Sequence, residues 1–131
     1  MIILICGVGR AGKTTYSQSF ENVLHSDGMG RKPQRFRNVI NALTDGDVII
    51  EGIYETSTLR VELLQAYKGK GSKCIWLDTS EQLVKERLKK DGIPMLSSHF
   101  YFEPPTLDEG WDEIVIIRGN DEQRISRQRE D

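Results

Sequence analysis

The chain has 131 residues, of which 37% are hydrophobic and 29% are charged, and its formal net charge is −2. These values are typical of one ordinary globular domain, and the small net charge excludes strong bulk attraction to nucleic acid or to an acidic surface. The longest apolar runs, residues 2–6 and 114–117, are too short to cross a membrane. The chain begins without a secretory leader pattern, so we expect a cytoplasmic protein in which Cys6 and Cys74 are buried thiols.

The first apolar run, residues 2–6, predicts a buried strand, and a glycine-rich turn follows it. Residues 7–15 read GVGRAGKTT, which matches the G-x-x-x-x-G-K-[ST] pattern of a phosphate-binding loop. A chance match in an ordinary glycine-rich turn is the alternative, but the preceding strand and a helix expected over residues 13–20 favour a site for ATP and Mg²⁺. The predicted phosphate-binding residues are Gly7, Gly9, Arg10, Ala11, Gly12, Lys13, Thr14 and Thr15. Of these, Lys13 is expected to reach the β- and γ-phosphates, and the Thr14 hydroxyl is expected to ligate Mg²⁺.

The second and third apolar runs, residues 22–25 and 47–52, place two carboxylates near the ends of strands. Ligands of an open parallel sheet bind beyond the carboxyl ends of its strands, so both carboxylates should face the phosphate-binding loop. Asp27 is a candidate general base, with a turn-forming role before Gly28 as the alternative. Glu51 is a candidate Mg²⁺ ligand acting through a water, with a role in capping the turn at Gly52 as the alternative.

A basic segment, RKPQRFR at residues 31–37, leads into a helix whose apolar stripe includes Phe36 and Val39. Cations are unfavourable at the start of a helix, so contact with phosphate groups is one explanation for this segment. A solvated basic turn is the leading interpretation of the segment, and phosphate contact is the alternative.

The fourth apolar run, residues 73–78, precedes a helix that we expect to begin after Thr79 as its N-cap and to end at Gly92. Arg87 lies at the edge of the apolar face of this helix. Its guanidinium is therefore a candidate for neutralising charge on a transferred phosphoryl group. The alternative is an arginine that lies along the edge of the core or pairs with Glu81 or Glu86.

The fifth apolar run, residues 113–117, completes an alternation of strands and helices. This alternation predicts a three-layer α/β domain with a five-stranded parallel sheet over residues 1–119. Residues 120–131 contain one apolar residue, Ile125, among many charges, and we expect a frayed, charged tail.

The order of the P-loop, HSDG, VIIEG, LVKERL and YFEPPTLDEGWDEIVII resembles the phage-type polynucleotide 5′-hydroxyl kinase family of small P-loop kinases. The resemblance covers most of residues 2–117, and the block at residues 102–114 is its most discriminating part. It implies the nucleoside/nucleotide kinase-like P-loop NTPase fold, with a central P-loop strand and a mobile lid after the fourth strand's helix. It also implies transfer of the γ-phosphoryl of ATP to the 5′-hydroxyl of DNA or RNA.

The resemblance also implies roles for individual residues. Lys13 and Thr14 would serve the ATP phosphates and Mg²⁺, Asp27 would activate the acceptor hydroxyl, and Arg87 would contact the γ-phosphate. Arg60 matches an arginine near the acceptor. Arg31 stands one residue further from Asp27 than in the family's D-x-x-R pattern, and with Arg35 of the same basic segment it completes the candidate acceptor-binding residues.

The leading hypothesis is therefore an ATP-dependent kinase that acts on a polynucleotide 5′ end. One alternative is a kinase for a nucleoside, a nucleotide or another small hydroxyl acceptor. Another is an NTP-binding or NTP-hydrolysing module without kinase activity. The sequence lacks the N-K-x-D motif of guanine-nucleotide switches, which counts against that last class, and it does not indicate an oligomeric state.

Overall fold

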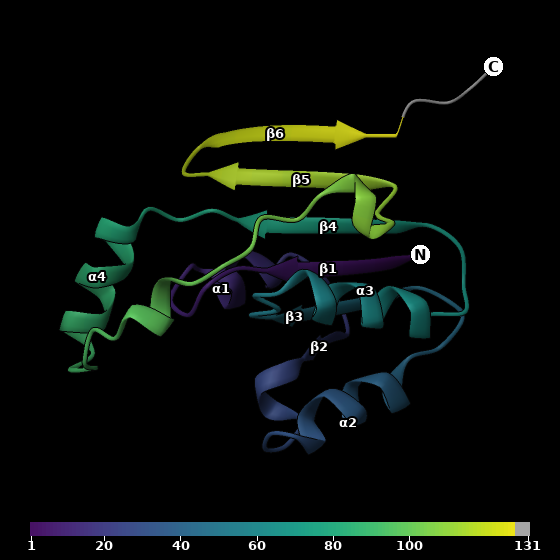
Figure 1. The fold of residues 1–131 in the computed structure, drawn as a ribbon, viewed down its shortest axis with the longest axis horizontal. Helices are drawn as coiled ribbons and strands as arrows, with labels where there is room; N and C mark the ends of the chain where they lie inside the picture. The colour runs from purple at the N-terminus through teal and green to yellow at the C-terminus, as the bar shows by residue number, and fades with distance from the viewer. Residues whose placement is uncertain (128–131) are drawn as a thin grey trace.

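The computed structural model describes residues 1–127, which form a six-stranded sheet with helices on both of its faces (Figure 1). The strands are β1 (Ile2–Cys6), β2 (Val23–His25), β3 (Val48–Gly52), β4 (Ser72–Leu77), β5 (Glu113–Arg118) and β6 (Asp121–Ser126). The α-helices are α1 (Lys13–Ser17), α2 (Gln34–Ala42), α3 (Ser57–Ala66) and α4 (Glu81–Lys90). Three single-turn helices are η1 (Ser26–Gly28), η2 (Ser97–Phe100) and η3 (Leu107–Glu109).

The strand order is β2-β3-β1-β4-β5-β6, and β1, the strand before the phosphate-binding loop, lies between β3 and β4. Strands β1 to β5 are parallel, so their carboxyl ends lie at one edge of the sheet, and α4 lies beyond that edge (Figure 1). Neighbouring residues of β1 face opposite layers: Leu4 packs in the core with Leu63 of α3, whereas Ile5 packs in the core that Tyr16 of α1 covers. The predicted three-layer α/β fold is thus confirmed.

The expected number of strands is wrong, because the segment that we expected to be a frayed tail contains a sixth strand. β6 pairs antiparallel with β5, and Gly119 begins the connecting turn with φ 62°. Most of its side chains are exposed, and Ile125 packs against the core. An edge strand of this kind is held by backbone hydrogen bonds, so it needs little apolar sequence. Residues 128–131 of the expected tail lie outside the described residues.

Two expected helix boundaries also differ. Helix α1 ends at Ser17, before the expected residue 20. The N-cap of α4 is Ser80, whose hydroxyl accepts a hydrogen bond from the Leu83 backbone N–H. Thr79 instead donates its hydroxyl hydrogen bond to the Ala11 carbonyl at 2.7 Å, which ties the end of β4 to the phosphate-binding loop. Within the described residues, no helix has the length and apolar content needed to cross a membrane.

Candidate active site

A cavity of about 660 Å³ lies at the carboxyl edge of the sheet and is lined by the phosphate-binding loop, α1, η1, the ends of β3 and β4, and α4. It gathers most of the residues that the sequence singles out: Gly9, Arg10, Gly12, Lys13, Thr14, Thr15, Asp27, Glu51 and Arg87. We call it the phosphate cavity. Residues more than seventy positions apart in the chain therefore line one space, as the strand-end argument predicts.

The loop that forms this cavity depends on glycine at two positions. Gly7 has φ 155°, and a Cβ there would lie 2.9 Å from the Leu77 carbonyl oxygen. Gly12 has φ 101° and is the N-cap of α1, so it holds the backbone in the left-handed region where the helix begins. The loop consequently passes close to β4 and leads into α1 in the strand–loop–helix order of a phosphate-binding loop.

Lys13 lies within this loop and is only 6% exposed. Its Nζ donates a hydrogen bond to the Val8 carbonyl at 2.8 Å, across the loop. Burial lowers the pKa of Lys13 from its ordinary value, while the nearby carboxylates of Glu51 and Asp27 oppose that shift. The three charges therefore act on one another, and an anion placed in the cavity would offset the cost of burying the ammonium group.

Glu51 is buried at the end of β3, 4% exposed, beside His25 at the end of β2. The Nδ1 atom of His25 lies 2.9 Å from Oε2 of Glu51, a distance at which a protonated Nδ1 donates a hydrogen bond. His25 thus orients a carboxylate that the sequence analysis assigned without a partner. The carboxylate of Glu51 and the hydroxyl of Thr14 are oxygen donors in the same cavity, and such donors fit Mg²⁺, which binds few protein groups and keeps several waters.

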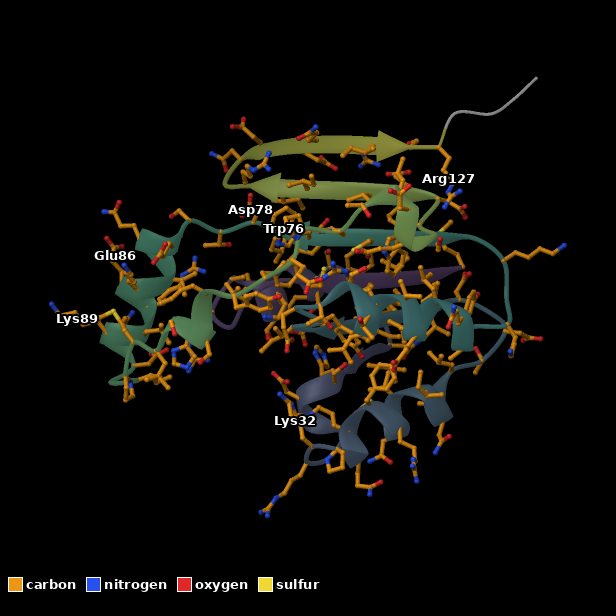
Figure 2. The ribbon with its side chains drawn as sticks, viewed as in Figure 1. Lys32, Trp76, Asp78, Glu86, Lys89 and Arg127 are labelled. Atoms are coloured by element: carbon orange, nitrogen blue, oxygen red, sulfur yellow. The ribbon has the colours of Figure 1, made fainter. Side chains whose placement is uncertain are left out.

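Arg87 reaches the phosphate-binding loop from α4. Its Nη1 donates a hydrogen bond to the Arg10 carbonyl at 2.6 Å, and the same atom would lie 3.7 Å from a Cβ on Gly12. The side chain of Arg10 pairs in turn with Asp91 at 2.8 Å, just after α4. The outer face of α4 carries Glu86 and Lys89, which point away from the sheet (Figure 2). Arg87 is therefore the basic residue of α4 that lines the phosphate cavity.

Asp27 lies on η1, and its side chain is 63% exposed. It lines the phosphate cavity and also a second cavity of about 400 Å³, which we call the side cavity. Arg35 of α2 lies on the side cavity, with its Nη1 3.4 Å from Oδ1 of Asp27. Arg31, by contrast, is exposed and lines neither of these two cavities.

The side cavity is formed mainly by residues that the sequence analysis did not single out. Tyr54 has φ 48°, and its hydroxyl lies 2.9 Å from the Ser26 hydroxyl, in a buried hydrogen bond. Phe36 of α2 packs near Tyr54, with ring centroids 6.4 Å apart. A tyrosine in the left-handed region two residues after a strand has no pattern in the sequence, so this cavity was not foreseeable from spacing alone.

Arg60 lines neither of these two cavities, and its expected place near an acceptor stays a prediction. Its side chain is fully buried on α3. Nε and Nη2 donate to the two carboxylate oxygens of Glu109, both at 2.8 Å, and Nη1 donates to the Tyr54 carbonyl at 2.8 Å. Glu109 also accepts a hydrogen bond from Trp111 Nε1 at 3.0 Å. Although burial alone would lower the pKa of Arg60, the hydrogen bonds and charge of Glu109 raise it.

The segment between α4 and η3, where the resemblance implies a lid, is anchored next to α3. The backbone N–H of Glu103 donates to the Glu55 carbonyl at 2.8 Å. Its carboxylate accepts hydrogen bonds from the Ser57 backbone N–H and the Tyr101 hydroxyl. These contacts lower the pKa of Glu103, the bond from Ser57 having the largest effect. One residue before Glu103, Phe102 stacks on Trp76 with ring centroids 5.5 Å apart.

Comparisons with known proteins identify the fold. No protein-family model matches the sequence, and no curated protein matches it. The structure is similar to that of a gluconokinase from Sinorhizobium meliloti 1021, with a TM-score of 0.68 and 15% identity over 91% of this chain and 82% of that one. It is also similar to the Deinococcus radiodurans tunicamycin resistance protein, with a TM-score of 0.52 and 18% identity over 73% of this chain and 72% of that one. These similarities confirm a P-loop kinase-type fold, whereas the resemblance to polynucleotide kinases stays a prediction.

Proposed function

We propose that the protein is an ATP-dependent phosphotransferase that moves the γ-phosphoryl group of ATP to a hydroxyl group. The observation that carries this proposal is the position of Asp27. Its carboxylate lines the phosphate cavity together with Lys13, and it also lines the side cavity. A carboxylate between a triphosphate site and a second cavity is suited to accept the proton of an attacking hydroxyl.

In this proposal the chain's own residues mainly position charge. The loop backbone and Lys13 bind the phosphates, and Arg87, already at the loop, neutralises charge on the transferred group. Thr14 and Glu51 would hold Mg²⁺, which supplies further neutralisation of the phosphate oxygens. Asp27 takes the hydroxyl proton as the new O–P bond forms, and the bond from the γ-phosphorus to the bridging oxygen of ADP breaks.

Two classes of acceptor follow from different observations. A polynucleotide 5′-hydroxyl is favoured by the family resemblance and by the basic segment 31–37, in which Arg35 contacts Asp27. A small hydroxyl compound is favoured by the limited volume of the side cavity, and the similarity to a gluconokinase fold is compatible with it. A module that only hydrolyses NTP would have no need of a second cavity next to Asp27.

The proposal is tested by incubating the protein with ATP labelled on the γ-phosphate and with 5′-OH oligonucleotides, small alcohols or no acceptor. We expect label transfer to at least one hydroxyl compound. Asp27→Asn should lower kcat of that transfer by about 10²–10⁴-fold without weakening ATP binding. Asp108→Asn, at an exposed aspartate of η3, is the matched control and should keep full activity. Release of free phosphate alone, with no labelled acceptor, would refute the proposal.

A further inference from the structure

The side cavity has walls that are mainly apolar and only a narrow set of polar groups. Phe36 and Val39 of α2 form one wall, and Ile53, Tyr54 and Leu59 form the other. The cavity shares Asp27 and Ile53 with the phosphate cavity, so the two spaces adjoin at the candidate general base. A group held in the side cavity would therefore lie next to a hydroxyl held at Asp27.

We infer that the acceptor is a small alcohol whose reacting hydroxyl is attached to an apolar, ring-sized body that carries an acidic group. This inference rests on the proposed phosphotransferase function and narrows its acceptor. It predicts that sugars, sugar acids and polynucleotide ends are poor acceptors.

Four of the polar side chains that line the cavity, those of Ser26, Asp27, Arg35 and Tyr54, are already paired with other groups of the protein. The hydroxyls of Ser26 and Tyr54 share a hydrogen bond of 2.9 Å. Arg35 uses Nε for the Gly30 carbonyl at 3.0 Å and Nη1 for Asp27 at 3.4 Å. A sugar or sugar acid in this space would leave several of its hydroxyls without partners, and each buried polar group without a partner costs about 1–3 kcal/mol. An apolar body has no such requirement and is stabilised by removal from water.

The acidic group is indicated by the charges at the rim. Lys32 and Arg35 line the cavity together with two carboxylates, Asp27 and Glu55. Arg35 pairs with Asp27 at 3.4 Å, whereas neither Lys32 nor Glu55 forms an ion pair with the residues that the structure describes. Lys32 precedes α2, and its side chain is labelled in Figure 2 at the end of the molecule that holds η1 and α2. A carboxylate or phosphate on the apolar body would lie beside Lys32 and away from Glu55, which fixes its orientation with the hydroxyl toward Asp27.

Binding and transfer are measured separately, so that failure of the kinase proposal and failure of this inference are distinguishable. The probes are 3-(hydroxymethyl)benzoate, gluconate and a 5′-OH oligonucleotide, with binding followed by saturation-transfer NMR and transfer by label from ATP. We expect the benzoate to bind at least tenfold more tightly than gluconate or the oligonucleotide. Tighter binding of either of those two would overturn the inference. Binding of the benzoate without label transfer to any probe would refute the phosphotransferase proposal and leave the assignment of the cavity standing.

Variants test whether the benzoate binds in the side cavity. Leu59→Asn introduces a polar group into the apolar wall and should weaken binding of the benzoate by about tenfold or more, without changing ATP affinity. Leu96→Asn changes an exposed leucine away from the cavity and should have no effect. Lys32→Gln changes an exposed position where folding is not at risk. It should weaken binding of the benzoate but not binding of benzyl alcohol, which lacks the acidic group. Equal weakening of both ligands by Lys32→Gln, or unchanged binding in Leu59→Asn, would show that the side cavity does not hold the acceptor.

Discussion

Replacing Arg60 distinguishes a structural arginine from an acceptor-binding one. Arg60→Met keeps a long apolar stem but removes the guanidinium, which donates two hydrogen bonds to Glu109 and one to the Tyr54 carbonyl. The variant leaves the Glu109 carboxylate buried, its side chain 3% exposed, with the hydrogen bond from Trp111 as its remaining partner among these contacts. Breaking a buried ion pair by removing one partner costs about 3–5 kcal/mol.

This cost converts into a large change in melting temperature. At about 2.1 cal/mol/K of unfolding entropy per residue, 131 residues give about 0.28 kcal/mol/K, so the expected decrease in Tm is roughly 11–18 °C. The measurement is thermal unfolding followed by circular dichroism, supported by urea denaturation. Arg60→Lys keeps the charge but loses the two-pronged geometry, so its Tm should lie between those of the wild type and Arg60→Met.

The matched control is Arg124→Met on β6. Arg124 also contacts two carboxylates, Glu113 at 2.8 Å and Glu122 at 2.7 Å, but its side chain is 58% exposed. Exposed pairs contribute about 0–1 kcal/mol, so this variant should unfold within a few degrees of the wild type. If Arg60→Met also unfolded within a few degrees of the wild type, and instead raised KM for the acceptor, the structural assignment would be wrong and the acceptor role suggested by the family resemblance would be right.

Three further predictions concern charges at the site and beside it. Because burial lowers the pKa of Lys13 below 10.5, ATP affinity should decrease with rising pH sooner than for an ordinary lysine, as Lys13 loses its proton in the free protein. Calorimetry in buffers of different ionisation enthalpy should detect the matching proton uptake, and Lys13→Arg should show none. Arg87→Ala should lower kcat by about 10³-fold and the free energy of unfolding by only about 1 kcal/mol; an unchanged kcat in the label-transfer assay would exclude Arg87 from catalysis. The pKa of Glu103 is lower in the folded state than in the unfolded chain. Glu103 therefore stabilises the protein at any pH above its pKa in the unfolded chain, and this stabilisation is lost as the pH falls through its lower pKa in the folded state. Urea titrations from pH 3 to pH 7 should therefore show a shallower loss of stability at acid pH for Glu103→Gln than for the wild type, and identical profiles would contradict this assignment.

The elements that position the phosphate cavity were predictable because they depend on local patterns. A continuous apolar run marks each strand of β1, β3, β4 and β5, and the glycine pattern follows the first of them. Once these strands are parallel, geometry alone brings Asp27, Glu51 and the loop to the same edge. The structure shows this proximity, while the catalytic and metal-binding roles of these residues stay predictions for the experiments above.

The features that were missed depend on contacts between distant parts of the chain. Arg60 and Glu109 are separated by 49 positions, and nothing in the spacing of either residue indicates the other. The same is true of His25 and Glu51, which meet because β2 and β3 are neighbours in register. β6 was missed for a different reason: its charged, mostly exposed side chains hide a strand that backbone pairing with β5 creates.

The position of Asp27 also bears on how this protein could change over time. The phosphate-binding loop and α4 line the phosphate cavity on one side of the Asp27 carboxylate, whereas α2 and the segment from β3 into α3 line the side cavity on the other. Substitutions in the second group would alter which alcohol is accepted without touching the residues that bind the nucleotide. A library confined to residues 32–39 and 53–59 is therefore the economical route to new acceptors, and Asp27 is the residue that such a library must leave unchanged.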